Sequence, residues 1–301
     1  MKQKINKKII SIMLIVVITI GLVACKSTND DLYTSKIIDV TNDGLGISTE
    51  TNIWTGTYFT KDNMKDKTCT ANGESYTGSY KKSIVEKTNS YTTDIYIDEN
   101  DIEFGLRDDN GKLTYINYMN KEFFDTVPYL PDTSNPYETA ITIAADIADD
   151  YLKNINEYTQ IIDEPKSDTR EKDGITYEMT YYFITYARKV SGYFTSDYIT
   201  VKVTSKGKLA SIKMGDIDVF ENTNIDINKE LIDDSISNKI DITYKKIKFD
   251  VKTTDITDQK LVVTPDGEIC VTSKITIEGT KEDGTETKTG IYLNTIVKKD
   301  K

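Results

Sequence analysis

The sequence predicts an α+β fold, in which a β-rich N-terminal unit is followed by two units that each combine one helix with an antiparallel sheet. Short runs alternate apolar and polar residues and are separated by Asn-Gly and Asp-Gly turns, which is typical of antiparallel strands. Two longer stretches have helical spacing instead, and alternating strands follow each of them. Helices segregated to one face of an antiparallel sheet define the α+β class.

The 301 residues suffice for two or three domains of ordinary size. We expect the chain to divide into five segments. They are a signal peptide (1–24), a polar tether (25–32), a β-rich unit (33–130), a first α+β unit (134–221) and a second α+β unit (222–301).

The N-terminal segment has the layout of a secretory signal. Residues 1–8 are basic, and residues 9–23 form an apolar run without a charge. That run is short for a transmembrane span, which needs about 20 residues. The alternative is an uncleaved membrane helix with an incidental cysteine.

The end of this segment resembles the lipobox of bacterial lipoproteins, with Leu22, Ala24 and Cys25 at the three defining positions. The resemblance implies that diacylglycerol is attached to the Cys25 thiol and that a peptidase cuts after Ala24. Two acyl chains anchor a protein firmly, because each buried CH₂ contributes about 0.8 kcal/mol. The predicted location is therefore the extracytoplasmic face of the cell membrane, with the lipid on Cys25 as the membrane contact.

The β-rich unit contains the clearest predicted hairpin. Residues 101–107 alternate, with Ile102, Phe104 and Leu106 on one face, and residues 112–117 return after an Asp-Asn-Gly turn. A further strand is expected upstream at 91–98. Together these segments predict a β-meander.

The first α+β unit opens with the strongest helix signals of the chain. Asn135 can cap the helix, Pro136 suits its first position, and Glu138 stands three residues after the cap. A polar loop is expected at 163–174, and strands are expected after it. The residues of the helical apolar stripe are Ala140, Ala144, Ile147, Ala148, Tyr151 and Ile155.

The second α+β unit repeats this order. Asp226 is the expected cap of a helix that contains Leu231, Ile232, Ile236 and Ile240. Strand-like stretches follow at 244–251 and 258–264, a Pro-Asp-Gly turn at 265–267, and further strands at 269–277 and near 286–297.

The order helix, long strand, hairpin, strand over about 134–297 resembles the PepSY-like and YcdB-type repeats of bacterial envelope proteins. Three segments carry the resemblance: the alanine-containing helix at 138–152, the strands with a Lys-Gly-Lys hairpin at 182–214, and the Pro-Asp-Gly-Glu turn at 265–268. The terminal Asp-x-x-x-Gly of such repeats is absent. The resemblance implies a noncatalytic envelope module, sometimes linked to protease inhibition or to the regulation of envelope enzymes, and it transfers no functional residue.

Charge and composition exclude several function classes. The net charge is −11, and removal of the four lysines in residues 1–24 would make it −15, so nucleic-acid binding is not expected. The chain has no histidine, which excludes Ser-His-Asp and Cys-His catalysis and leaves no Cys/His zinc site. We therefore expect no metal and no cofactor. The abundance of Lys, Ile, Asn and Asp is typical of an AT-rich genome and suggests a Gram-positive source.

Two cysteines remain after Cys25. In an oxidising exterior, Cys69 and Cys270 could form a disulfide, and the alternative is two separate buried thiols.

Acidic clusters at 98–101 and 108–110 flank the predicted hairpin. Calcium binds oxygen ligands of this kind, but ordinary turn chemistry explains Asp and Asn equally well. Carboxylate pairs could also hydrolyse glycosides without histidine, although no spacing singles out a pair. Trp54 is the one tryptophan, and Tyr177, Tyr181 and Tyr193 fit sheet faces better than a sugar-binding platform.

The sequence therefore favours a membrane-anchored surface lipoprotein that binds an envelope partner through its sheets or loops and is not an enzyme. Two alternatives remain: a transporter-associated substrate-binding lipoprotein and a carboxylate-based hydrolase. The alternating βαβ order that is common in substrate-binding proteins is missing here.

Overall fold

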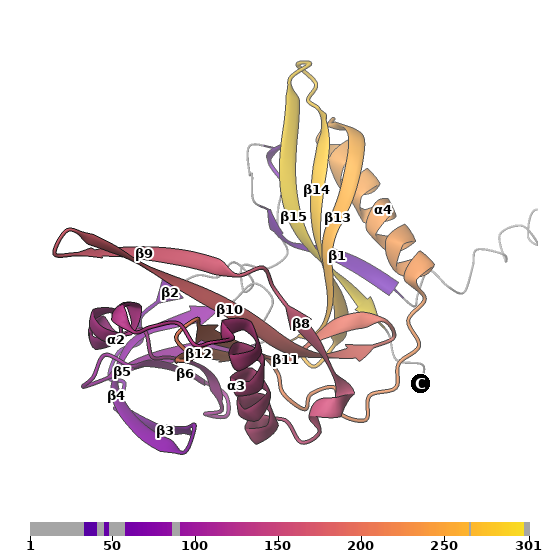
Figure 1. The fold of residues 1–301 in the computed structure, drawn as a ribbon. Coiled ribbons are helices and arrows are strands. Elements are labelled where there is room, and N and C mark those ends of the chain that lie inside the picture. Colours follow the sequence, from indigo (N-terminus) through magenta and orange to yellow (C-terminus); the bar gives the residue numbers. More distant parts are fainter. Residues whose placement is uncertain (1–32, 41–44, 48–57, 86–90, 265, 298–301) are drawn as a thin grey trace, which may run out of the picture.

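The computed structural model describes residues 33–40, 45–47, 58–85, 91–264 and 266–297. The predicted signal peptide, the tether and Trp54 lie outside these residues. Strands make up 52% of the described residues and helices 19%, and all the strands belong to one mixed sheet of 15 strands (Figure 1). The predicted α+β class is therefore wrong, because the described chain is mainly β and its sheets are not separate.

The described elements follow one another in the order β1–β7, four helical segments (α2, η2, α3 and η3), β8–β12, α4 and β13–β15. The helical segments are α2 (Lys121–Thr126), η2 (Val127–Tyr129), α3 (Pro136–Tyr151), η3 (Ile155–Glu157) and α4 (Lys229–Lys246). The strands are β1 (Tyr33–Val40), β2 (Tyr58–Phe59), β3 (Lys67–Ala71), β4 (Glu74–Val85), β5 (Thr92–Asp98), β6 (Glu103–Arg107), β7 (Leu113–Asn117), β8 (Tyr158–Ile162), β9 (Lys166–Lys172), β10 (Ile175–Val190), β11 (Tyr193–Thr204), β12 (Leu209–Met214), β13 (Asp250–Val263), β14 (Ile269–Thr280) and β15 (Glu286–Val297).

Three pairings between segments that are distant in sequence make the sheet continuous. β12 pairs antiparallel with β7, β1 pairs antiparallel with β15, and β11 pairs parallel with β13. The parallel pairing is short, since it joins only Phe194 to Lys260 and Thr195 to Leu261. It makes the sheet mixed and connects its two halves.

The helix α3 covers one face of the first half of the sheet, where it packs against β10 and β11 (Figure 1). It begins at Pro136 as predicted, although the Asn135 side chain makes no capping hydrogen bond. The fully buried Ala140, Ala144 and Ala148 let the helix lie close to the strands. Opposite them, the buried Ile184, Val201, Ile212, Ile116, Phe104 and Tyr96 complete the first core.

The helix α4 forms the second core with β1, β13 and β15. Its buried stripe contains Ile232, Ile236 and Ile240, as the sequence predicts. The cap is Asn228 rather than the predicted Asp226, because the Asn228 side chain accepts hydrogen bonds from the N–H groups of residues 230 and 231. Of the described helices, none has the length and hydropathy to cross a membrane.

Two predicted local structures are wrong. The polar loop expected at 163–174 contains the strand β9, which forms a long hairpin with β10. The strand expected at 244–251 comprises instead the last three residues of α4, a turn at 247–249 and the start of β13 at Asp250. Both segments are rich in charged residues, and their apolar residues follow neither helical nor strand spacing clearly. Tertiary pairing therefore determines their structure.

Candidate functional site

The structure describes two of the three candidate site residues from the sequence. Cys25 lies outside the described residues. Cys69 on β3 and Cys270 on β14 are both buried and both free, so the possible disulfide is not formed. Burial raises the pKa of the Cys69 thiol to about 11 and that of Cys270 to about 12. Protonated, buried thiols are neither nucleophiles nor metal ligands at neutral pH.

The acidic clusters around the β6–β7 hairpin serve turns and ion pairs. The Asp98 carboxylate accepts the N–H groups of Asn100 and Ile102. Asp109 pairs with the Arg107 guanidinium at 2.6 Å. Within the described ranges, no three Asp, Glu or Cys side chains gather as a metal site would require. Turn chemistry, the second of the two explanations from the sequence, is the one that the geometry supports.

The side of the sheet that faces away from α3 contains many polar side chains, and we call it the open face. Cross-strand partners point to the same side of a sheet, and successive residues of a strand point to opposite sides. The residues Ile184, Val201 and Ile212 form an apolar row towards α3, so their strand neighbours form the open face.

Two adjacent rows of side chains cross seven strands on the open face, from β10 to β4. The registers of successive strand pairs define each row. The first row is Thr185, Thr200, Lys213, Tyr115, Gly105, Ile95 and Lys82, and the second is Phe183, Lys202, Ser211, Asn117, Glu103, Ile97 and Ser79.

The larger hollow of the open face has a volume of about 460 Å³ and lies over β8, β10, β11, β12 and β13. Three lysines contribute to its lining, and hydroxyl groups and apolar side chains complete it. The Thr185 and Thr200 hydroxyls hydrogen-bond each other at 2.8 Å across β10 and β11. The lining residues are Ile161, Asp163, Phe183, Thr185, Ala187, Phe194, Thr195, Tyr198, Thr200, Lys202, Ser211, Lys213 and Lys260.

A smaller hollow of about 210 Å³ continues the open face over β4–β7, and Lys213 lines both hollows. The Tyr115 hydroxyl donates to the Glu103 carboxylate inside it. The Lys82 ammonium lies 4.1 Å from the centre of the exposed Tyr58 ring. The hollow therefore combines aromatic rings, a cation and a carboxylate whose hydrogen bond is already made.

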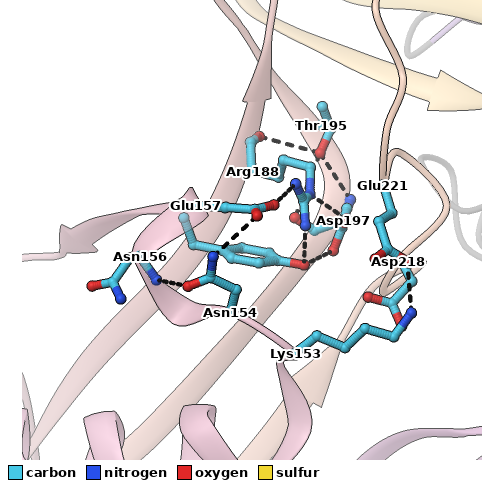
Figure 2. A network of polar contacts seen from close by, with 10 residues as sticks. Lys153, Asn154, Asn156, Glu157, Arg188, Thr195, Asp197, Asp218 and Glu221 are labelled. Carbon is cyan, nitrogen blue, oxygen red and sulfur yellow. Dashed lines mark hydrogen bonds and ion pairs between the residues drawn. The ribbon is translucent and has the colours of Figure 1, made fainter.

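A largely buried polar network joins three of the strands that contribute to the larger hollow (Figure 2). The Arg188 guanidinium on β10 donates to Asp197 on β11 at 2.9 Å and also to Glu157. The Tyr158 hydroxyl on β8 donates to the other Asp197 oxygen at 2.8 Å. Thr195 lines the hollow, and its hydroxyl donates to the Arg188 carbonyl at 3.2 Å. Three strands are thereby locked together at one end of the hollow.

The charge state of this network follows from its contacts. Burial alone would lower the pKa of Arg188, but its hydrogen bonds to Glu157, Tyr158 and Asp197 outweigh burial and raise that pKa. Arg188 is therefore a permanent cation. Lys153, which follows α3, pairs with Glu221 at 2.6 Å and Asp218 at 3.6 Å and ties α3 to the segment before α4 (Figure 2). We assign the Arg188 network to support of the sheet, whereas the Lys153 side chain is largely exposed and its ion pairs contribute little.

Sequence reasoning identified the outward polar positions of single strands but not the hollows. In residues 197–204 the alternation correctly indicates that Ile199, Val201 and Val203 share the inner face. Thr200 and Lys202 then point outwards. Their rows extend to Lys82 and Ser79 of β4, which are distant in sequence, and one sequence contains no signal for that register.

A comparison with protein-family models found no match, and neither did a comparison with curated proteins. The resemblance to PepSY-like repeats therefore stays a prediction, and the case for a function depends on the open face and on the N-terminal segment.

Proposed function

We propose that the protein is a lipid-anchored, noncatalytic binding protein of the cell envelope, and that the open face is its binding surface. The observation that carries the proposal is the pair of polar rows, which face away from α3 and contain both hollows. Concave surfaces with apolar walls and a few placed polar groups are where proteins bind ligands.

The chemistry of the open face supports binding rather than bond cleavage. The Thr185 and Thr200 hydroxyls hydrogen-bond each other, and the Glu103 carboxylate accepts a hydrogen bond from Tyr115. The carboxylates that line the two hollows are Asp163 and Glu103, and they come from different hollows. Such groups hold a partner through hydrogen bonds and charge.

The lipid anchor rests on the N-terminal segment. A basic start, an apolar run and Leu22, Ala24 and Cys25 at their lipobox positions all coincide. Mass spectrometry of the membrane fraction tests this part of the proposal. We expect an N-terminus at Cys25 with an added diacylglycerol. The Cys25→Ala variant should yield no mature, lipidated protein in the membrane fraction. An intact Met1 without lipid would contradict the anchor.

Site-specific photo-crosslinking in cells tests the binding surface. A photo-reactive residue at Thr200 or Ser211 on the open face should give a defined adduct with an envelope component. The matched control is Ile242 on α4, whose side chain is 57% exposed on a different surface. Equal adduct formation at Ile242, or none at Thr200 and Ser211, would show that the open face is not the binding surface.

A further inference from the structure

The larger hollow combines apolar walls with cations, although the protein as a whole is acidic with a net charge of −11. Ile161, Phe183, Ala187 and Phe194 provide the apolar part of the lining. Lysines come from three strands, and Asp163 is the carboxylate in the lining. This combination suits a ligand that has an apolar body and a negative charge.

Lys202 on β11 is the key cation of the hollow. Its ammonium lies 3.7 Å from the centre of the Tyr181 ring and donates to the Met119 sulfur at 3.2 Å. Among the residues that the structure describes, no carboxylate lies within ion-pair distance of this ammonium, and the side chain is half-buried. Burial lowers the pKa of Lys202, and the distant charges of Asp168 and Lys166 act on it in opposite directions. An anion beside it would compensate the lost hydration.

Lys260 on β13 lies on the other side of the hollow. The parallel pairing places it directly beside Phe194 of β11, whose ring lines the same hollow. Its ammonium is 3.7 Å from the Asp258 carboxylate, and both side chains are about half exposed. Along β10, six strand positions of about 3.3 Å separate the partner of Lys202 from the partner of Phe194, so Lys260 lies too far from Lys202 for one carboxylate to contact both.

We propose that the larger hollow binds an amphiphilic organic acid, whose carboxylate lies beside the Lys202 ammonium and whose apolar body contacts Phe183, the direct cross-strand partner of Lys202. The volume of about 460 Å³ is that of a small-molecule site. The inference deepens the proposed function, since it names the ligand class of the open face and rests on that face being a binding surface.

Binding of 2-naphthoate, compared with its uncharged analogue 2-naphthamide, tests the proposal. The full chain is held in phosphatidylcholine nanodiscs, and empty nanodiscs give the blank for calorimetry. We expect 2-naphthoate to bind at least fivefold more tightly than 2-naphthamide, because the two differ in charge and hardly in shape. Equal affinities, or no binding of 2-naphthoate, would overturn the proposal.

Lysine variants separate a specific site from general attraction. Lys202→Met should weaken 2-naphthoate binding at least fivefold and leave 2-naphthamide binding unchanged. The control Lys260→Met removes one charge at the far end of the same hollow, and Lys248→Met removes one at an exposed position, paired with Glu282, outside it; both should keep the wild-type affinities. Wild-type affinity of Lys202→Met would overturn the proposal, and where this variant fails to fold, the comparison of 2-naphthoate with 2-naphthamide on the wild-type chain decides.

The outcome is distinguishable from failure of the proposed function. If 2-naphthoate does not bind while Thr200 still gives adducts in cells, the organic-acid inference alone is wrong. If 2-naphthoate binds as expected and no adducts form, the ligand class holds and the envelope partner is wrong.

Discussion

At the scale of single residues, Asp197 shows how the sheet tolerates a fully buried carboxylate. Its side chain is 0% exposed, and both oxygens accept hydrogen bonds, one from Arg188 and one from Tyr158. A buried charge is stable only when it is paired and hydrogen-bonded. The arrangement makes the network sensitive to loss of one partner.

We expect Arg188→Met to lower the free energy of unfolding by about 3 kcal/mol, because it leaves the Asp197 carboxylate buried without its cation. Urea denaturation followed by circular dichroism measures the change. Lys153→Met is the control, since Lys153 is largely exposed and its ion pairs are on the surface. A wild-type midpoint for Arg188→Met would contradict the role given to this network.

The two free cysteines give a second expectation at the residue scale. In the full chain with Cys25→Ser, Ellman's reagent at pH 9 should find no reactive thiol in the native protein and two after unfolding. A thiol with the ordinary pKa of 9.0 is half ionised at that pH, whereas Cys69 with a pKa of about 11 stays protonated. Zero thiols in the unfolded, unreduced protein would show a disulfide.

The same raised pKa values link stability to pH. Between about pH 9 and pH 11 the unfolded chain releases thiol protons that the folded chain keeps, so the unfolded state binds fewer protons. The contribution of these thiols to stability is complete below pH 9 and falls as the pH rises through this window.

At the scale of elements, the helices α3 and α4 and the β6–β7 hairpin were predictable, whereas the pairings between strands that are distant in sequence were not. Pro136 and the alanine stripe locate α3, and the spacing of Ile232, Ile236 and Ile240 locates α4, because helical periodicity is a local signal. The strand β9 has no such signal. Its exposed, charged residues pair with β10 alone, at the margin of the sheet, where burial does not constrain the sequence.

A pair of substitutions on α4 tests how this helix is held. Ile236→Ala should lower the free energy of unfolding by about 3 kcal/mol, because Ile236 is 1% exposed in the second core and its truncation leaves a cavity. Ile242→Ala on the same helix should change it by less than about 0.5 kcal/mol, because that side chain is 57% exposed. Equal effects in urea denaturation would mean that α4 packs through another face.

At the scale of the whole molecule, two large cores and a smaller third cluster around Val127, Met179, Tyr181 and Ala210 share one sheet in the described residues. The first core lies under α3 and the second under α4, and the parallel pairing of β11 with β13 connects them through two residue pairs. This architecture, and with it the open face, could not be predicted from the sequence. The rows of Thr200 and Lys202 exist only because β12 pairs with β7, and sequence periodicity describes single strands rather than their order.

Native-state hydrogen exchange can show whether the cores open separately. In Ile236→Ala we expect faster exchange in β13–β15 and also in β1, whose Ile37 belongs to the second core. Amides of β12, and of β10 and β11 away from Val190 and Tyr193, which belong to the second core, should keep their wild-type rates, because few strand pairings cross between the halves. Acceleration of all strands by the same factor would indicate one cooperative unit.

The pairing of β1 with β15 has a mechanical consequence for the anchored form proposed above. Only seven residues separate Cys25 from Tyr33, so β1 begins within roughly 25 Å of the lipid. Any pull on the anchor therefore enters the molecule through β1. That strand is joined to β15 over seven residue pairs, and its Ser35 also bonds Ser235 of α4. A pull along β1 loads these bonds together, and the second core bears the force while the open face keeps its shape.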